Sequence, residues 1–182
     1  MRVLLVQPLA GLIEPGSWVR SCFMEPLGLE YVAGAAARAG HETCCVHPVA
    51  GAREFSDLIC RQRPDVVGYS VYSYAFEQAV RWASVARAVL PEVVNVFGGY
   101  HPSAVPLDVA KAPCVDYAVA GEGEKAFVEL LACLSRGVRR PQIPGVVYAG
   151  MAQTCQARKA LRCVDLDRLP YPFRDRALLE RT

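Results

Sequence analysis

The chain has 182 residues, of which 53% are hydrophobic, and a formal net charge of +2 from 20 basic and 18 acidic residues. This length suits one domain with a small appendage, the hydrophobic content excludes a disordered chain, and the balanced charge gives no basic stripe for a nucleic-acid partner. No apolar stretch reaches the roughly 18 residues that span a bilayer, and residues 1–7 are typical of a buried strand rather than a secretion signal, which argues against a membrane partner and predicts a cytoplasmic protein.

Short apolar runs alternate with amphipathic segments along most of the chain. Residues 2–7 form a continuous apolar run of the kind found in a parallel strand that is covered on both faces. Residues 74–90 form the clearest helix, because apolar side chains recur on one face and Pro91 ends the pattern. By the same criteria we expect strands at 43–47, 66–70, 93–97 and 115–120, and helices at 26–39, 54–62, 107–111 and 124–136.

This alternation predicts an α/β fold with a doubly wound, five-stranded parallel sheet and right-handed crossovers. We expect the strand order 2-1-3-4-5, as in flavodoxin-like relatives of the Rossmann fold. The alternation ends with the last expected helix, so residues 1–137 are interpreted as the α/β domain and residues 138–164 as a small β appendage. Within the appendage, residues 146–148 and 152–155 are expected to form a hairpin. Residues 165–182, rich in proline and charge, are interpreted as a linker toward a catalytic domain outside this sequence.

The chain contains eight cysteines, and their spacing argues against a metal site. None forms a C-x-x-C pair and no three lie close together, as zinc and iron–sulfur sites require. Several stand in strand-like or helix-like runs, where a thiol packs as a small hydrophobic group. We therefore expect reduced, mostly buried thiols and no metal ligands.

Two glycine-rich turns each follow an expected strand. Gly98 and Gly99 follow the fourth strand, and Gly121-Glu122-Gly123-Glu124 follows the fifth. Glycine lets the backbone approach a ligand closely, and ligands of open α/β sheets bind at the carboxyl ends of the strands. Both turns therefore predict a binding site at the carboxyl ends of the strands, here called the carboxyl edge. The irregular stretch at 8–25, which contains Trp18, belongs to the same edge, either as a lid on its own domain or as a ligand contact.

Other chemistries fit these positions poorly. A receiver domain needs acidic residues where Gln7 and Ser70 stand, and a flavodoxin needs a phosphate loop rich in hydroxyl groups after the first strand. Residues 121–126 match G-x-G-x-x-A, but they place two carboxylates where a pyrophosphate would bind. A lone histidine in a turn, such as His101, is more often a structural residue than a catalyst. No catalytic residue is assigned.

The ordered string of motifs resembles the cobalamin-binding domain at the amino end of cobalamin-dependent radical S-adenosylmethionine enzymes. Its most specific part is G-G-x-H-P-S, here Gly98-Gly99-Tyr100-His101-Pro102-Ser103, followed by Val115-Asp116 and by Gly121-Glu122-Gly123-Glu124. Weaker matches extend the resemblance over most of the chain, at residues 2–6, 25–31, 39–42, 64–70 and 169–170.

The resemblance implies a corrinoid held over the carboxyl ends of the strands, with its nucleotide tail beside the sheet. The positions that line the tail slot in the family correspond to Ser70, Gly98 and Gly99, and the missing side chains of the glycines leave room for a benzimidazole. Further cofactor contacts are expected from Tyr72, Tyr100, His101, Gly121 and Glu122.

Two missing motifs refine this expectation. The D-x-H-x-x-G motif, which supplies a histidine to cobalt in methionine-synthase-like proteins, does not follow the first strand; this predicts base-off cobalamin without a histidine ligand from that loop. The C-x-x-x-C-x-x-C motif that holds a [4Fe-4S] cluster is missing as well, so this chain alone is not expected to be catalytic. The resemblance then places S-adenosylmethionine and the cluster in a following radical S-adenosylmethionine domain, in the same chain or in a partner chain.

We therefore expect a cobalamin-binding module that holds methylcobalamin for methyl transfer by a separate radical S-adenosylmethionine barrel. The alternative is a standalone corrinoid carrier or sensor that acts by protein contact, and a reading frame that continues into a three-cysteine motif would separate the two. A flavin- or nucleotide-binding domain of the same topology stays open, as does a fold whose glycines only make turns.

Overall fold

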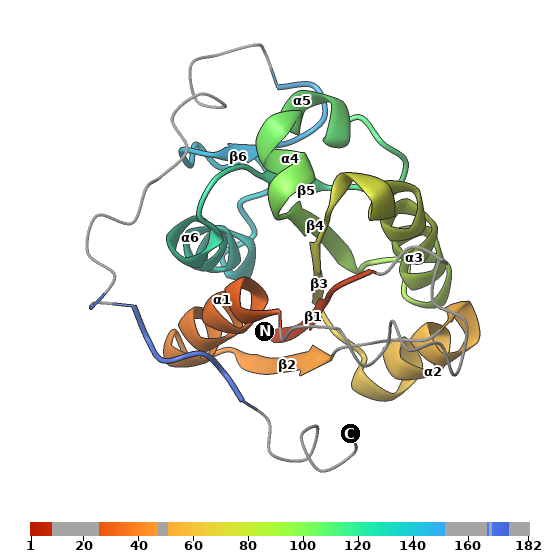
Figure 1. The fold of residues 1–182 in the computed structure, drawn as a ribbon, viewed down its shortest axis with the longest axis horizontal. Helices are drawn as coiled ribbons and strands as arrows, with labels where there is room; N and C mark the ends of the chain where they lie inside the picture. The colour runs from red at the N-terminus through yellow and green to blue at the C-terminus, as the bar shows by residue number, and fades with distance from the viewer. Residues whose placement is uncertain (9–25, 47–50, 152–166, 168, 175–182) are drawn as a thin grey trace.

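A single sheet forms the centre of the computed structural model, which describes residues 1–8, 26–46, 51–151, 167 and 169–174. Its strands are β1 (Arg2–Val6), β2 (Glu42–Val46), β3 (Val66–Ser70), β4 (Val94–Gly98), β5 (Tyr117–Val119) and β6 (Val146–Val147). Within the described residues, the strands are ordered β2-β1-β3-β4-β5-β6 (Figure 1). β1 to β5 are parallel, and β6 pairs antiparallel with β5 at the edge of the sheet.

Helices cover both faces of this sheet. They are α1 (Leu27–Arg38), α2 (Ala52–Gln62), α3 (Phe76–Val89), α4 (Tyr100–Ala104), α5 (Pro106–Val109) and α6 (Gly123–Ser135), with a 3₁₀ turn η2 (Ser73–Ala75). α1 and α6 lie on one face, α2 and α3 lie on the other, and the short α4 and α5 follow β4 (Figure 1). None of the helices in the described part of the chain is both long and apolar enough to cross a membrane.

The central strands are apolar on both sides because both faces of the sheet are covered. In β1, Leu4 and Val6 pack into the cluster formed with α2 and α3, whereas Val3 and Leu5 pack into the cluster formed with α1 and α6. Successive residues of a strand thus alternate between the α2/α3 face and the α1/α6 face. This alternation decides which side of the sheet each residue at a strand end adjoins.

A buried polar network joins β3, β4 and α3. Asn95, fully buried in β4, accepts a hydrogen bond from the Tyr69 hydroxyl (3.0 Å) and donates one to the Ala83 carbonyl (3.2 Å). The Asn95 backbone N–H donates to the Asp116 carboxylate (2.7 Å), which also pairs with Arg87 at 2.5 Å. The aspartate of the Val115-Asp116 motif therefore has a structural role: it ties the start of β5 to β4 and α3.

The predicted order 2-1-3-4-5 is confirmed, but the described residues form a sheet of six strands rather than five. β6 comes from the segment expected to begin a hairpin, and it pairs with β5. Residues 152–155, the expected second strand of that hairpin, lie outside the described residues. The turn after the fourth strand continues directly into α4, because Gly99 is followed by helical backbone. The limits of the α/β domain, the appendage and the linker stay predictions.

Candidate functional site

Ser70 and Gly98 lie side by side at the carboxyl ends of two neighbouring strands. They end β3 and β4, and they are paired in the parallel register. Val66, Val94 and Val96 of these strands pack on the α1/α6 face, so alternation places Ser70 and Gly98 on that same face. The structure thus brings together the serine and the first glycine that were expected to line one slot.

Gly98 and Gly99 are glycines for different reasons. Gly99 has a φ of +95°, and a Cβ there would lie 2.9 Å from the Val71 nitrogen, so the turn itself requires glycine. Among the described residues, a Cβ on Gly98 would meet only the carbonyl oxygens of Val119 and Tyr69, at 3.9 and 4.0 Å, which are ordinary contacts. The described residues therefore do not require glycine at position 98. Glycine in a strand also weakens the strand, so strand stability does not favour it either. None of the described residues therefore explains the choice of glycine at this position.

The α1/α6 face is already filled two residues below Ser70. A Cβ on Gly68 would overlap Leu5 Cδ2 and would lie 3.5 Å from the ring of Phe127. Leu5 and Phe127 therefore fill the space beside β3 at the level of Gly68. Among the described residues, room for an added Cβ is thus found at Gly98, at the end of β4, and not at Gly68, in the middle of β3.

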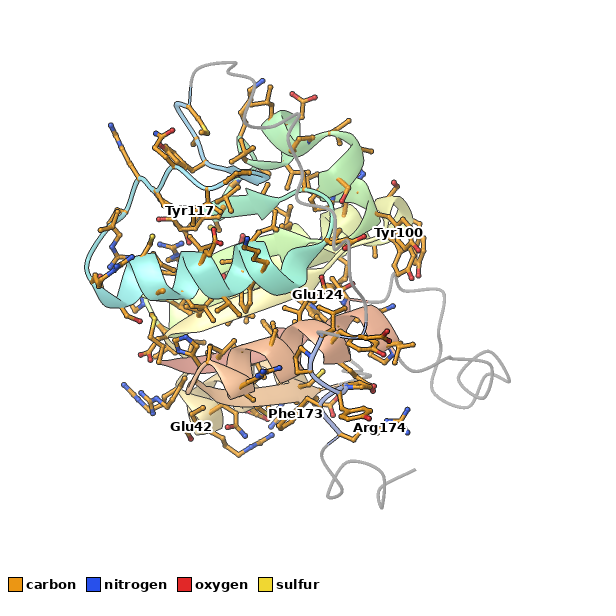
Figure 2. The ribbon with its side chains drawn as sticks, turned by 90° about the vertical axis from the view of Figure 1, so that its left-hand side faces the viewer. Glu42, Tyr100, Tyr117, Glu124, Phe173 and Arg174 are labelled. Atoms are coloured by element: carbon orange, nitrogen blue, oxygen red, sulfur yellow. The ribbon has the colours of Figure 1, made fainter. Side chains whose placement is uncertain are left out.

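Three tyrosines form a stack next to this edge. The ring of Tyr72 stacks on Tyr74 at a centroid distance of 5.6 Å and on Tyr100 at 5.2 Å. Tyr100 is 74% exposed, and Figure 2 shows it projecting from the molecule at the end of α4 nearest the sheet. Tyr74 was not among the expected site residues; it lies in η2, four residues after the end of β3, and its place two residues from Tyr72 was a usable signal. The stack offers flat apolar surface to a ligand at the carboxyl edge.

His101 is held by protein contacts. Its Nδ1 lies 3.1 Å from the Ser73 hydroxyl, and its ring packs on Phe76 at a centroid distance of 4.5 Å. Its backbone N–H donates to the Val71 carbonyl at 3.0 Å. These contacts fix α4 against the turn after β3, so the structural interpretation of His101 has support from the geometry.

Ser103 joins the two glycine-rich turns. Its hydroxyl donates to the Gly99 carbonyl (2.7 Å) and accepts from the Gly121 backbone N–H (2.9 Å). Gly121 has a φ of +80°, which favours glycine there. The two turns that the sequence singled out are therefore neighbours in space. Ser103 belongs to the G-G-x-H-P-S motif but was not among the expected site residues. Its hydroxyl, within a glycine-rich motif, was the sequence feature that could have indicated this role.

Two carboxylates stand at the start of α6. Glu122 is exposed and precedes the helix, while Glu124 is half-buried in its first turn. Glu124 Oε2 is buried without a hydrogen-bond partner among the described residues, and burial, together with the charge of Glu122, raises the pKa of its carboxyl. Figure 2 shows Glu124 where α6 and α1 come together near the carboxyl edge. A partly buried carboxylate of this kind can accept hydrogen bonds from a ligand.

Two cavities formed by described residues lie at the amino ends of the strands, opposite the expected site. One of about 500 Å³ and one of about 280 Å³ are lined by residues near the amino ends of the strands, including Arg2, Asp65 and Asp116. Neither is lined by an expected site residue. Trp18 and residues 9–25 lie outside the described residues.

The described cysteines and acidic side chains form no metal site. No group of three or more His, Cys, Asp or Glu side chains in the described ranges has an arrangement that could hold a metal ion. The expectation that the thiols are mostly buried holds only in part among the described cysteines, since Cys45 is buried and Cys60 is exposed.

Comparisons with known proteins agree on one family. The B12 binding domain family matches residues 20–131. The "Uncharacterized methyltransferase PH0819" of Pyrococcus horikoshii is 32% identical over 154 residues, which cover 82% of this chain and 33% of that protein. The "Cobalamin-dependent radical SAM methyltransferase TokK" of Streptomyces tokunonensis is 35% identical over 127 residues, which cover 69% of this chain and 18% of that protein.

A solved structure shows the same fold. The radical S-adenosylmethionine methyltransferase TsrM of Kitasatospora setae, with cobalamin and a [4Fe-4S] cluster bound, matches with a TM-score of 0.64 at 24% identity. The match covers 81% of this chain and 27% of that one, so this chain spans a third or less of the length of each of these proteins. The family match covers more than half of the chain and includes all the expected site residues. This chain belongs to the B12-binding domain family and is homologous to cobalamin-dependent radical S-adenosylmethionine methyltransferases.

Proposed function

We propose that cobalamin binds at the carboxyl ends of β3 and β4, with its nucleotide tail entering beside Gly98. One observation carries this proposal: position 98 is glycine, although the described residues leave room for a Cβ there, and it lies next to the small Ser70 of the neighbouring strand. A planar benzimidazole needs backbone within van der Waals distance and no Cβ in its path. Gly99 makes the turn that lets the chain leave this edge into α4.

The residues around this position suit the two kinds of surface that a corrinoid has. Its apolar ring surface can pack on the outer, exposed side of the stack that Tyr72 forms with Tyr100. Its amide side chains donate hydrogen bonds that the carboxylate of Glu122 can accept. His101 and Gly121 stay predicted contacts, and both are also held in the turns by hydrogen bonds within the protein.

We further propose that cobalamin binds base-off, without a histidine from the loop after β1. β1 leads into Gln7, which is buried, and Pro8, and residues 8–25 contain no histidine. The His101 ring is engaged with Ser73 and Phe76, which favours a structural role over one as cobalt ligand.

In the proposed role, the chain is the cofactor-holding part of a methyltransferase. Methylcobalamin, when bound, supplies the methyl group, and this domain positions it toward a separate radical S-adenosylmethionine domain that carries S-adenosylmethionine and a [4Fe-4S] cluster. The short span of this chain relative to its relatives supports that division of labour. A reading frame that continues into a C-x-x-x-C-x-x-C motif would distinguish it from a standalone corrinoid carrier or sensor.

Retention of cofactor by the purified chain tests the proposal. We expect the absorbance of hydroxocobalamin to stay with the protein through gel filtration and to show the base-off spectrum, while flavin mononucleotide, as a matched control, elutes separately. A chain at micromolar concentration that retains no corrinoid would overturn the proposed function. Retention of flavin instead would favour a flavin-binding domain of the same topology, and a base-on spectrum would contradict only the base-off assignment.

A further inference from the structure

Residues 169–174, here called the C-terminal strap, lie against α1. Figure 1 shows this blue segment crossing the helix, and Figure 2 shows Phe173 and Arg174 beside it. The Phe173 backbone N–H donates to the Glu30 carbonyl at 2.9 Å, and the Phe173 side chain packs against the core cluster of the α1/α6 face. The strap is far from α1 in sequence, yet it contributes to the same core.

Gly34 makes this close packing possible. A Cβ at this position inside α1 would lie 2.5 Å from the Tyr171 carbonyl oxygen and 3.5 Å from the Phe173 nitrogen. Glycine in a helix interior destabilises the helix, so a glycine there needs a reason. In the same helix, a Cβ on Gly28 would meet nothing within 4 Å. The space that Gly34 leaves open is occupied by the backbone of the strap.

Charge supports the same contact. Glu30 is only 9% exposed, and the Arg174 guanidinium lies 3.9 Å from its carboxylate. A carboxylate removed from water is stabilised by a nearby cation. The strap therefore brings a hydrogen-bond donor, an aromatic ring and a positive charge to one stripe of α1.

We propose that the Glu30/Gly34 stripe of α1 is a docking site for the chain's own residues 171–174, and that it fixes the point at which the chain leaves the domain. The sequence interpretation of this segment as a linker is thereby refined: its described part is bound, and a following domain would start from a set position. Glu30 lies in the first turn of α1, which follows β1, so this position is near the carboxyl edge of the sheet. The proposal goes beyond cofactor binding and does not depend on it.

Paired glycine substitutions in the full chain test the docking site. Gly34→Ala forces a Cβ into the Tyr171 carbonyl, whereas Gly28→Ala adds one where nothing is in contact. We expect hydrogen exchange at the Phe173 amide to be slow in the natural chain and in Gly28→Ala, and at least about tenfold faster in Gly34→Ala. Equal protection of this amide in all three proteins, or no protection in the natural chain, would overturn the proposal.

Paired aromatic truncations keep the test valid if Gly34→Ala proves poorly folded. The Phe173 ring is packed, while the Tyr171 side chain is 94% exposed. We expect limited trypsin treatment to cleave after Arg174 at least about tenfold faster in Phe173→Ala than in the natural chain, and at an unchanged rate in Tyr171→Ala. Mass spectrometry identifies the product that ends at Arg174. Equal cleavage rates in both variants would show that the strap is not docked through Phe173.

Discussion

Replacing Gly98 by valine separates cofactor binding from folding. The Cβ of the new side chain would find only ordinary contacts with the protein, at 3.9 and 4.0 Å, and a β-branched residue suits a strand. We therefore expect the free energy of unfolding to change by less than about 1 kcal/mol. If the nucleotide tail lies against this backbone, the added carbon atoms overpack its slot, which costs about 1–3 kcal/mol. That penalty corresponds to a dissociation constant for cobalamin about 5- to 150-fold larger.

The assay compares cobalamin with cobinamide, a corrinoid that lacks the nucleotide tail. Spectroscopic titration of Gly98→Val should show weakened binding of cobalamin and little change for cobinamide, because only the tail meets the new side chain. Gly51→Val is the matched control, since it adds the same side chain to extended backbone at the start of α2, where a Cβ meets nothing within 4 Å. Denaturant unfolding of both variants measures their stability.

Two results would refute this reasoning. An unchanged dissociation constant for cobalamin in a folded Gly98→Val protein would show that the tail does not pass position 98. A loss of several kcal/mol in unfolding free energy would show that the fold itself requires this glycine. Gly99→Ala is expected to behave in that second way, losing about 1–3 kcal/mol, because of its φ of +95° and its contact with Val71.

Three further predictions concern stability and reactivity. Asn95→Ala should lower the unfolding free energy by about 2–4 kcal/mol in denaturant titrations, because it leaves the buried Tyr69 hydroxyl without its acceptor. A loss below about 1 kcal/mol would contradict a stabilising role of this hydrogen-bond network. Glu124→Gln should raise the unfolding free energy relative to the natural chain at neutral pH, and this difference should disappear at about pH 4; a difference independent of pH would contradict the raised pKa. Iodoacetamide should modify the exposed Cys60 and spare Cys45 in the folded chain, because Cys45 is buried and a pKa of about 12 leaves almost no reactive thiolate. Peptide mass spectrometry measures the modification of each cysteine, and equal modification of both would contradict the prediction.

The sign of the Glu124 prediction follows from proton linkage. Burial raises the folded-state pKa of this carboxyl above its ordinary value, so the folded chain binds the proton more tightly than the unfolded chain. The resulting stabilisation is complete below the ordinary pKa and is lost as the pH rises through the folded-state value. A glutamine keeps the shape without the charge, so the advantage of the variant grows over that same window.

The alternation of apolar runs and amphipathic segments was enough to predict the order of the first five strands. Burial on both faces of a parallel sheet imposes a continuous apolar pattern that can be read locally, as in β1 and β3. The motif residues at the carboxyl ends of the strands were also readable, since Gly98 ends β4, Gly99 follows it and Gly121 comes shortly after β5. A strand at β6 was expected, but not its place in the sheet, because its pairing with β5 is a contact between segments that are distant in the sequence.

The sequence by itself determined the α/β class, the strand order and the resemblance to a cobalamin-binding domain, because these depend on patterns that repeat along the chain. Only the tertiary structure decided that the turn requires glycine at Gly99 while the described residues leave room for a Cβ at Gly98, that Ser103 joins the two turns, and that Gly34 receives the C-terminal strap. All of these depend on which backbone atoms of distant segments come within a few ångströms of a given residue. The sequence pattern does not give the distances between these atoms, because they are set by the folded backbone.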